Sequence, residues 1–208
     1  MINALIEAYR LKDEVRTGWT LRGVRDPESV ADHSWGTAYL VLLYADEAEV
    51  DRARALEIAL VHDLAEAKTG DVATRVAAMR DPRRVEEKAR RERGAMDELM
   101  EAYTPQRASR VRGLWEEYEA TATPEAVLVR EMNLIDMCLQ AYVYEKSERY
   151  DPDAPNDHFP DYRGLDEFFA TTAPRLRTPV GERLFREIAE AYARLPRVAA
   201  RGGLHLEP

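Results

Sequence analysis

Apolar residues recur at intervals of three and four along most of this 208-residue chain. Two segments show the interval most clearly: Leu56, Ala59, Leu60 and Leu64, and Met132, Ile135, Leu139 and Val143. This spacing gathers apolar side chains on one face of an α-helix. Only 10 glycines and 11 prolines interrupt the pattern. The sequence therefore predicts an all-α fold, and its length suits a single compact domain.

Seven segments carry the helical pattern: residues 2–15, 34–48, 51–66, 82–103, 105–118, 124–148 and 180–195. Asp51, Asp81 and Thr123 directly precede three of them, and such side chains accept hydrogen bonds from the free N–H groups of a first helical turn. Proline follows the last two of these caps, where a helix tolerates it. Residues 150–163, rich in proline and aspartate, are expected to form a loop, and the residues after Pro196 a frayed tail.

Composition excludes several classes of protein. Acidic residues outnumber basic ones by 39 to 30, a net charge of −9, whereas proteins that bind nucleic-acid polymers usually carry a basic surface. No apolar run approaches the roughly 18 residues of a membrane span, and the N-terminal segment lacks a signal-peptide pattern. Cys138 is the single cysteine, so no intrachain disulfide can form. We therefore expect a cytoplasmic protein that binds neither nucleic-acid polymers nor membranes.

Two of the four histidines have acidic neighbours. His33 follows Asp32 just before the helix expected over 34–48, and His62 precedes Asp63 near the end of the next helix. His62 and Asp63 interrupt an apolar run, where two ionisable side chains are costly to bury without partners. Imidazole nitrogens and a carboxylate oxygen are ligands for Mn, Co, Fe, Ni or Zn. The pattern is compatible with a metal site or with structural histidines paired to other groups.

Further acids follow His62. Glu66 lies four residues on, on the same face of the expected helix, and Asp71 comes directly after Gly70. Carboxylates gathered at one point repel each other unless a cation neutralises them or one of them stays protonated, as in many active sites. The alternative is a solvent-facing helix end followed by a turn.

An ordered series of short motifs resembles the HD-domain phosphohydrolases, specifically the branch of 5′-deoxynucleotidases and HD-domain-containing-2 proteins. The series covers about residues 5–148, and a helical extension over about 160–196 completes a single HD domain over 1–208. The motifs are RTGW from Arg16, PESVADHSW from Pro27, ALVHDLAE from Ala59, GDV from Gly70, EEK from Glu86, AM from Ala95, LWEEYE from Leu114, TPEA from Thr123, LQA from Leu139 and YE from Tyr144.

The resemblance implies roles for individual residues. His33, His62 and Asp63 would bind one divalent metal ion, which could be Mn, Co, Mg, Fe, Ni or Zn. Glu66 would be the acid and base of catalysis, and Asp71 would lie beside the substrate.

The RTGW motif would hold the nucleotide. The Arg16 guanidinium suits a phosphate, and the Trp19 indole offers an apolar face to the sugar or base. The resemblance also implies a homodimer.

One position departs from the family pattern. Asn133 stands where the family has the aspartate that completes the metal site, and Leu134 and Asp136 replace its lysine and glutamate. An amide oxygen can bind a hard cation but brings no charge, so metal affinity should fall. Asp136 lies one helical turn away, an offset of about 5 Å that is large against a metal–ligand distance. We expect Asn133, as a neutral ligand or through a metal-bound water, in preference to Asp136.

The two remaining histidines, His158 and His205, fall in the expected loop and tail, so we expect one metal ion. The resemblance implies a metal-dependent phosphohydrolase, a 5′-deoxynucleotidase that converts deoxynucleoside 5′-monophosphates to deoxynucleoside and phosphate. Two alternatives stay open. The chain could hydrolyse another phosphorylated metabolite or a cyclic nucleotide, or it could be a catalytically weak nucleotide-binding protein because of Asn133.

Overall fold

The structure is a computed structural model that describes residues 2–73, 82–154, 156–159 and 161–207. Helices dominate the described residues, which contain no β-sheet, so the all-α prediction is confirmed. The α-helices are α1 (Ile2–Tyr9), α2 (Thr17–Leu21), α3 (Val30–Tyr44), α4 (Arg52–Val61), α5 (Glu66–Thr69), α7 (Pro82–Met100), α8 (Pro105–Ala120), α9 (Pro124–Lys146), α10 (Asp166–Thr172), α11 (Pro179–Ala193) and α12 (Pro196–Ala200). Two short 3₁₀ helices, η1 (Arg10–Lys12) and η2 (Ala173–Arg175), follow α1 and α10.

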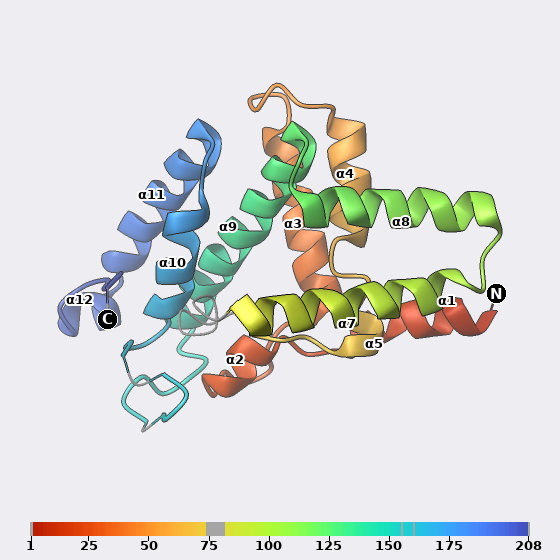
Figure 1. The fold of residues 1–208 in the computed structure, drawn as a ribbon. Coiled ribbons are helices and arrows are strands. Elements are labelled where there is room, and N and C mark those ends of the chain that lie inside the picture. The colour runs from red at the N-terminus through yellow and green to blue at the C-terminus, as the bar shows by residue number, and fades with distance from the viewer. Residues whose placement is uncertain (1, 74–81, 155, 160, 208) are drawn as a thin grey trace.

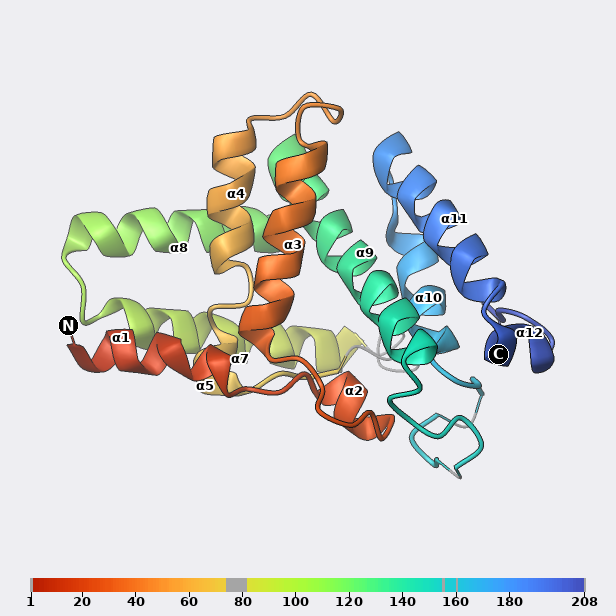
Figure 2. The same ribbon diagram turned by 180° about the vertical axis from the view of Figure 1, so that it is seen from behind.

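Helix α9 lies at the centre of the fold. Helices α3, α4 and α8 pack on one side of it, and α10 and α11 pack on the other (Figure 1). Helices α7 and α8 run side by side, and α1 and α5 lie along α7, as the reverse view also shows (Figure 2). Because it is surrounded, α9 buries residues on several faces, among them Val129, Met132, Ile135 and Cys138. Residues within one turn of α9 therefore contact different neighbouring helices.

The start of α3 corrects the predicted helix over 34–48. Ser29 caps the helix: its side chain accepts from the Asp32 N–H at 3.1 Å, and the Asp32 carboxylate accepts from the Ser29 N–H at 2.9 Å. This reciprocal pair satisfies two N–H groups that would otherwise lack partners, so the helix begins at Val30. His33 consequently lies inside the first turn of α3 and not before it.

The predicted helix over 51–66 is interrupted. Asp51 caps α4 as expected, accepting from two backbone N–H groups, but α4 ends at Val61 and α5 begins only at Glu66. His62 and Asp63 lie in the tight turn between them, so the expected helical face shared by His62 and Glu66 does not exist.

Thr123 caps α9 as predicted, whereas Asp81 lies outside the described residues. The chain after Pro196 is not frayed: it forms α12, and Arg201 pairs with two buried carboxylates, Glu145 at 3.0 Å and Asp166 at 3.2 Å. A charged contact with the interior holds this segment in place. Among the described helices, none combines the length and apolar character needed to cross a membrane.

Candidate active site

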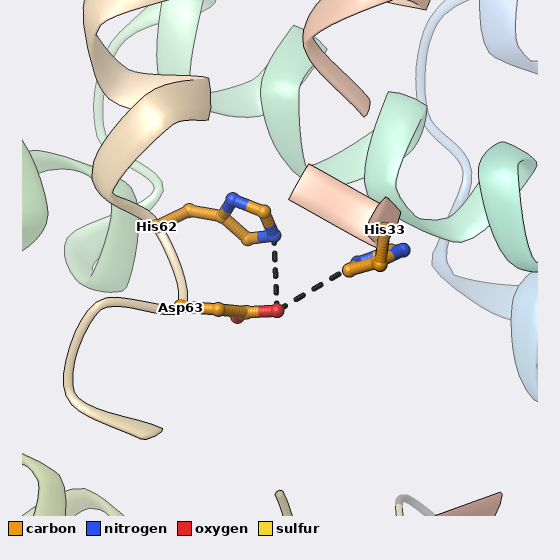
Figure 3. Close-up of side chains that lie close together, drawn as sticks. All are labelled: His33, His62 and Asp63. Carbon is orange, nitrogen blue, oxygen red and sulfur yellow. Dashed lines mark ion pairs between the residues drawn. The ribbon is translucent and has the colours of Figure 1, made fainter. Parts of the chain in front are cut away.

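His33, His62 and Asp63 meet where the first turn of α3 faces the turn that follows α4 (Figure 3). Asp63 Oδ2 lies 3.2 Å from His62 Nε2 and 3.7 Å from His33 Nε2, and both rings direct these nitrogens toward the carboxylate. One ligand atom from each residue falls within 4.8 Å of the other two. Both imidazoles are buried. The three side chains predicted to hold a metal are therefore brought together.

The other ring nitrogens fix the state of both histidines. His62 Nδ1 lies 2.8 Å from the Ala59 carbonyl oxygen and His33 Nδ1 lies 2.7 Å from Asp136 Oδ2, so each Nδ1 carries a proton and donates it. Each Nε2 is then an acceptor, and neither has a hydrogen-bond partner among the described residues. Burial and the nearby Arg16 charge lower the pKa of His33 to about 3, so this ring stays neutral. Two ring nitrogens without hydrogen-bond partners among the described residues, aimed at one carboxylate, fit a cation between them.

Asp136 orients the His33 ring through its contact with Nδ1, the ring nitrogen that does not face Asp63. Gly36, one turn after His33, makes room for it, because a Cβ at Gly36 would lie 2.0 Å from Asp136 Oδ1. Burial raises the pKa of Asp136 to about 7. Glu28 lies on the same side, so Glu28, His33 and Asp136 form a second close group.

Arg16 holds the acids of the site together. Its Nη1 lies 3.0 Å from Asp71 Oδ1, 3.3 Å from Asp63 Oδ2 and 3.8 Å from Glu66 Oε2. Asp71 also accepts from the Thr17 N–H at 2.6 Å, which ties the start of α2 to the residues after α5. The guanidinium is therefore shared among three carboxylates of the protein itself.

Two of the carboxyls around Arg16, those of Asp63 and Glu66, have pKa values shifted in opposite directions. Burial would raise the pKa of Asp63, but His62 and Arg16 together hold it well below its usual range. Burial and the Asp63 charge raise the pKa of Glu66 well above its usual range, and Glu66 Oε2 is buried without a hydrogen-bond partner among the described residues. A carboxyl with a lowered pKa thus lies next to one with a raised pKa, an arrangement suited to acid catalysis.

The HD-domain profile matches residues 8–164 of the chain, and these residues contain every side chain named so far in this site. The protein belongs to the HD-domain family. The resemblance predicted from the motifs is confirmed.

Relatives of this HD-domain protein match over most of its length. The 5′-deoxynucleotidase HDDC2 of Danio rerio is 35% identical over 185 residues, 89% of this chain and 84% of that protein. The 5′-deoxynucleotidase HDDC2 of Homo sapiens is 35% identical over 179 residues, 86% of this chain and 79% of that protein. Among solved structures, the PH0347 protein from Pyrococcus horikoshii OT3 superposes with a TM-score of 0.68 at 31% identity and covers 92% of this chain and 99% of that one.

Trp19 of this HD domain is more deeply placed than the sequence suggests. Its side chain is only 1% exposed, its Nε1–H donates to Glu28 at 2.8 Å, and Phe168 stacks on its ring at a centroid distance of 3.9 Å. The site opens into a pocket lined by His62, Asp63 and Glu66, among other residues. Phe168 is half-buried and also lines this pocket. Of these two stacked rings, Phe168 is therefore the one more accessible to a ligand, and Trp19 packs against it.

Asn133 and Asp136 occupy different places in the HD domain. Asn133 lines the pocket, and its Nδ2–H donates to the Tyr118 hydroxyl at 2.6 Å, while the Tyr118 ring contacts that of His62 at 5.2 Å. Asp136 contacts His33 Nδ1, not the Nε2 that faces Asp63. Asp136 therefore contacts His33 through the ring nitrogen that does not face Asp63, whereas Asn133 lines the pocket together with His62 and Asp63.

Sequence reasoning gave no role to five side chains that line the pocket. Lys88 and Tyr118 lie within motifs of the resemblance, which was the available signal for them. Arg130, Phe168 and Arg175 lie outside those motifs. Phe168 and Arg175 belong to the C-terminal part of the chain, and the packing of α10 on α9 brings them to the pocket.

Proposed function

We propose that this HD-domain protein is a metal-dependent phosphohydrolase, specifically a 5′-deoxynucleotidase that converts deoxynucleoside 5′-monophosphates to deoxynucleoside and phosphate. One observation carries the proposal: two buried histidines direct Nε2 atoms that lack hydrogen-bond partners among the described residues at the Asp63 carboxylate, beside Glu66, whose pKa is raised by burial and by the Asp63 charge. Relatives that cover most of the chain bear the name 5′-deoxynucleotidase, which supports the substrate class.

His33, His62 and Asp63 would hold one divalent ion, with Asn133 as a neutral fourth contact. Such an ion lowers the pKa of a water molecule and polarises a phosphoryl oxygen. The orphaned Nε2 atoms support this assignment, since a buried acceptor without a partner is costly unless a ligand satisfies it. Asp136 and the Ala59 carbonyl would keep both rings in the tautomer that binds metals. The donor set, with two nitrogens and a single carboxylate, favours Mn, Co, Fe, Ni or Zn over Mg.

Glu66 would supply the proton that the departing 5′-oxygen needs, because burial and the Asp63 charge raise its pKa and its Oε2 has no hydrogen-bond partner among the described residues. Asp71 would lie beside the substrate. It accepts hydrogen bonds from Arg16 and from the Thr17 N–H, and so would fix the position of Arg16 and of the start of α2. Arg16, which is paired with Asp63 and Asp71, would also bind the substrate phosphate. Trp19 would position the Phe168 ring, and that ring would contact the sugar or base.

The test is phosphate release from a panel of deoxynucleoside and ribonucleoside 5′-monophosphates, with Mn, Co, Mg, Fe, Ni and Zn added singly. We expect turnover of the deoxynucleotides with at least one transition metal, and loss of turnover in Glu66→Gln with metal binding retained. Turnover only of cyclic nucleotides or other phosphate esters would assign a different phosphohydrolase. Nucleotide binding without turnover under every metal would refute the enzyme and leave a binding protein, the alternative that Asn133 favours.

We also propose that two copies of the chain associate. Helix α3 presents an apolar face formed by Trp35, Tyr39, Leu42 and Leu43, with Trp35 70% exposed and stacked on Tyr39. Contiguous exposed apolar residues are typical of an interface between protein chains. Light scattering on the protein and on Trp35→Glu should give a dimer mass for the first and a monomer mass for the second. A monomer mass for the unaltered protein would refute the dimer.

The domain is proposed to be single, with a core over about 5–148 and an extension over about 160–196. Phe169, Leu184 and Tyr192 of the extension join the same apolar core as Val129 and Ile135 of α9, which supports one folding unit. The buried single cysteine, Cys138, supports a reducing, cytoplasmic setting.

A further inference from the structure

Among the described residues, four cationic side chains line the pocket, and two of them are paired with acids of the protein. Arg16 lies 3.0 Å from Asp71 and 3.3 Å from Asp63. Lys88 Nζ lies 3.2 Å from Glu92 and 4.0 Å from Glu66. Their positive charge is largely balanced before any ligand arrives.

The other two cations, Arg130 and Arg175, stand on the wall formed by α9 and by η2 after α10. Arg175 donates from Nε to the Thr171 carbonyl at 2.7 Å and forms no ion pair among the described residues. Its Nη2 is buried and has no hydrogen-bond partner among them. This guanidinium therefore has unused donors next to the pocket that it lines.

Arg130 is similar. Its guanidinium lies over the Tyr118 ring at 4.3 Å and donates from Nη2 to the Tyr118 carbonyl at 3.1 Å, while its Nε is buried without a partner in the described structure. The carboxylate paired with it, Glu119, is 3.8 Å away. Arg130 lies one helical turn before Asn133, so both residues face the same wall.

Buried donors without partners, Arg130 Nε and Arg175 Nη2 in the described structure, are costly, although the Arg130 side chain is itself partly exposed. Burial, together with the Arg130 charge, lowers the pKa of Arg175 to about 10, yet the group stays charged at neutral pH. Asn133 brings no negative charge to this wall, so no acid at that position balances the two arginines. Planar guanidinium donors match phosphate oxygens in geometry and charge, and an anion would satisfy both groups.

We propose that Arg130 and Arg175 form an oxyanion subsite that, together with Arg16, binds the phosphate of the substrate and also binds the released inorganic phosphate. The identity of the substrate rests on the proposed function. The binding of phosphate to this wall does not, because it needs no turnover.

The test measures binding of inorganic phosphate by calorimetry to the protein with Mn²⁺, for the unaltered chain, Arg130→Gln, Arg175→Gln and Arg175→Lys. Arg177→Gln is the matched control, since Arg177 is exposed and lies two residues beyond Arg175. We expect the phosphate Kd to rise about tenfold or more in both glutamine variants, since a charge-assisted hydrogen bond is lost. The lysine variant should show a smaller rise, because it keeps the charge without the planar fork. The control should not change.

Thermal melting separates this role from a structural one. Without phosphate, Arg175→Gln should melt at the same temperature as the unaltered protein or higher, because it removes an unpaired charge. Added phosphate should raise the melting temperature of the unaltered protein and not that of Arg175→Gln. Where the protein turns over deoxynucleotides, the same variant should raise KM.

Absence of phosphate binding by the unaltered protein would overturn the subsite, as would an unchanged Kd in both glutamine variants. Loss of deoxynucleoside binding with phosphate binding intact would also overturn it and assign the arginines to the base. Arginine-dependent phosphate binding in a protein that hydrolyses no phosphate ester would uphold the subsite and refute only the proposed function.

Discussion

Two regions of this protein bury several charged groups, and they do so differently. Around Arg201, both oxygens of Glu145 and both of Asp166 accept hydrogen bonds, from donors that include Arg201, Tyr192 and the His205 N–H. Around Arg16, two histidine nitrogens and Glu66 Oε2 are buried without partners in the described structure. The Arg201 network is closed at its carboxylates, although Arg201 Nε lacks a partner in the described structure, and it stabilises the fold. The Arg16 cluster instead leaves acceptors open for a ligand that the described residues do not supply. The following changes test that distinction, from the largest expected effect to the smallest.

Asp63→Asn should remove the metal and the activity together. The loss of metal affinity should exceed the roughly 100-fold that follows loss of an outer hydrogen-bond partner. Metal content after dialysis and phosphate release measure the two effects. Retained metal in this variant would place the ion elsewhere.

Arg201→Met should instead destabilise the fold. Breaking a buried ion pair on one side leaves Glu145 and Asp166 unbalanced, which costs about 3–5 kcal/mol of unfolding free energy. Urea denaturation measures this cost, and metal affinity should stay the same. Arg194→Met, at an exposed arginine of α11, is the control and should change stability by less than about 0.5 kcal/mol. Equal stability of the two variants would show that the closed network is not a structural one.

Asp136→Ala should weaken metal binding about 10- to 100-fold, because His33 loses the partner that fixes its ring. Asp136→Asn keeps an acceptor in place and should have a smaller effect. Competition with a coloured chelator gives both affinities. An equal loss in the two variants would indicate that the charge of Asp136, and not its hydrogen bond, matters.

Asn133→Asp should raise metal affinity by about tenfold, since it adds one negative charge beside the histidines. The Tyr118 hydroxyl, which accepts from Asn133, can turn to donate to the new carboxylate. The same chelator competition measures the gain. An unchanged affinity would place position 133 outside the reach of the ion.

The pH dependence of the unfolding free energy tests the cluster around Arg16 through Glu66. The pKa of Glu66 is raised in the folded protein, so the folded state holds a proton that the unfolded state releases earlier. In the metal-free protein, the unfolding free energy contributed by Glu66 is fully present below its ordinary pKa and is lost as pH rises through the folded value. Urea denaturation at several pH values should show a smaller decline in Glu66→Gln than in the unaltered protein.

Helical periodicity predicted the helices themselves well, but not where each one ends. The start of α3 depends on the Ser29 and Asp32 side chains, and the sequence reasoning counted Asp32 only as a neighbour of His33. The break after Val61 places His62 and Asp63 in a turn, although the apolar pattern continues through them. Local hydrogen bonds decided both boundaries, and apolar spacing does not report them.

The candidate site divides in the same way. Motif resemblance named His33, His62 and Asp63, and their convergence supports it. It gave no role to the contact of Asp136 with His33, which depends on how α9 packs on α3 and on the space at Gly36. Phe168 and Arg175 reach the pocket from α10 and η2, and only the tertiary fold brings them to residues more than 100 positions earlier.

The interruption between α4 and α5 has a mechanical consequence. His33 belongs to α3, whereas His62 and Asp63 belong to the turn after α4, so one ion bound by all three would act as a cross-link that closes a chain segment of about 30 residues. Metal-free protein would then differ from metal-bound protein in how firmly the two helices are clamped at this end, and not only in its chemistry.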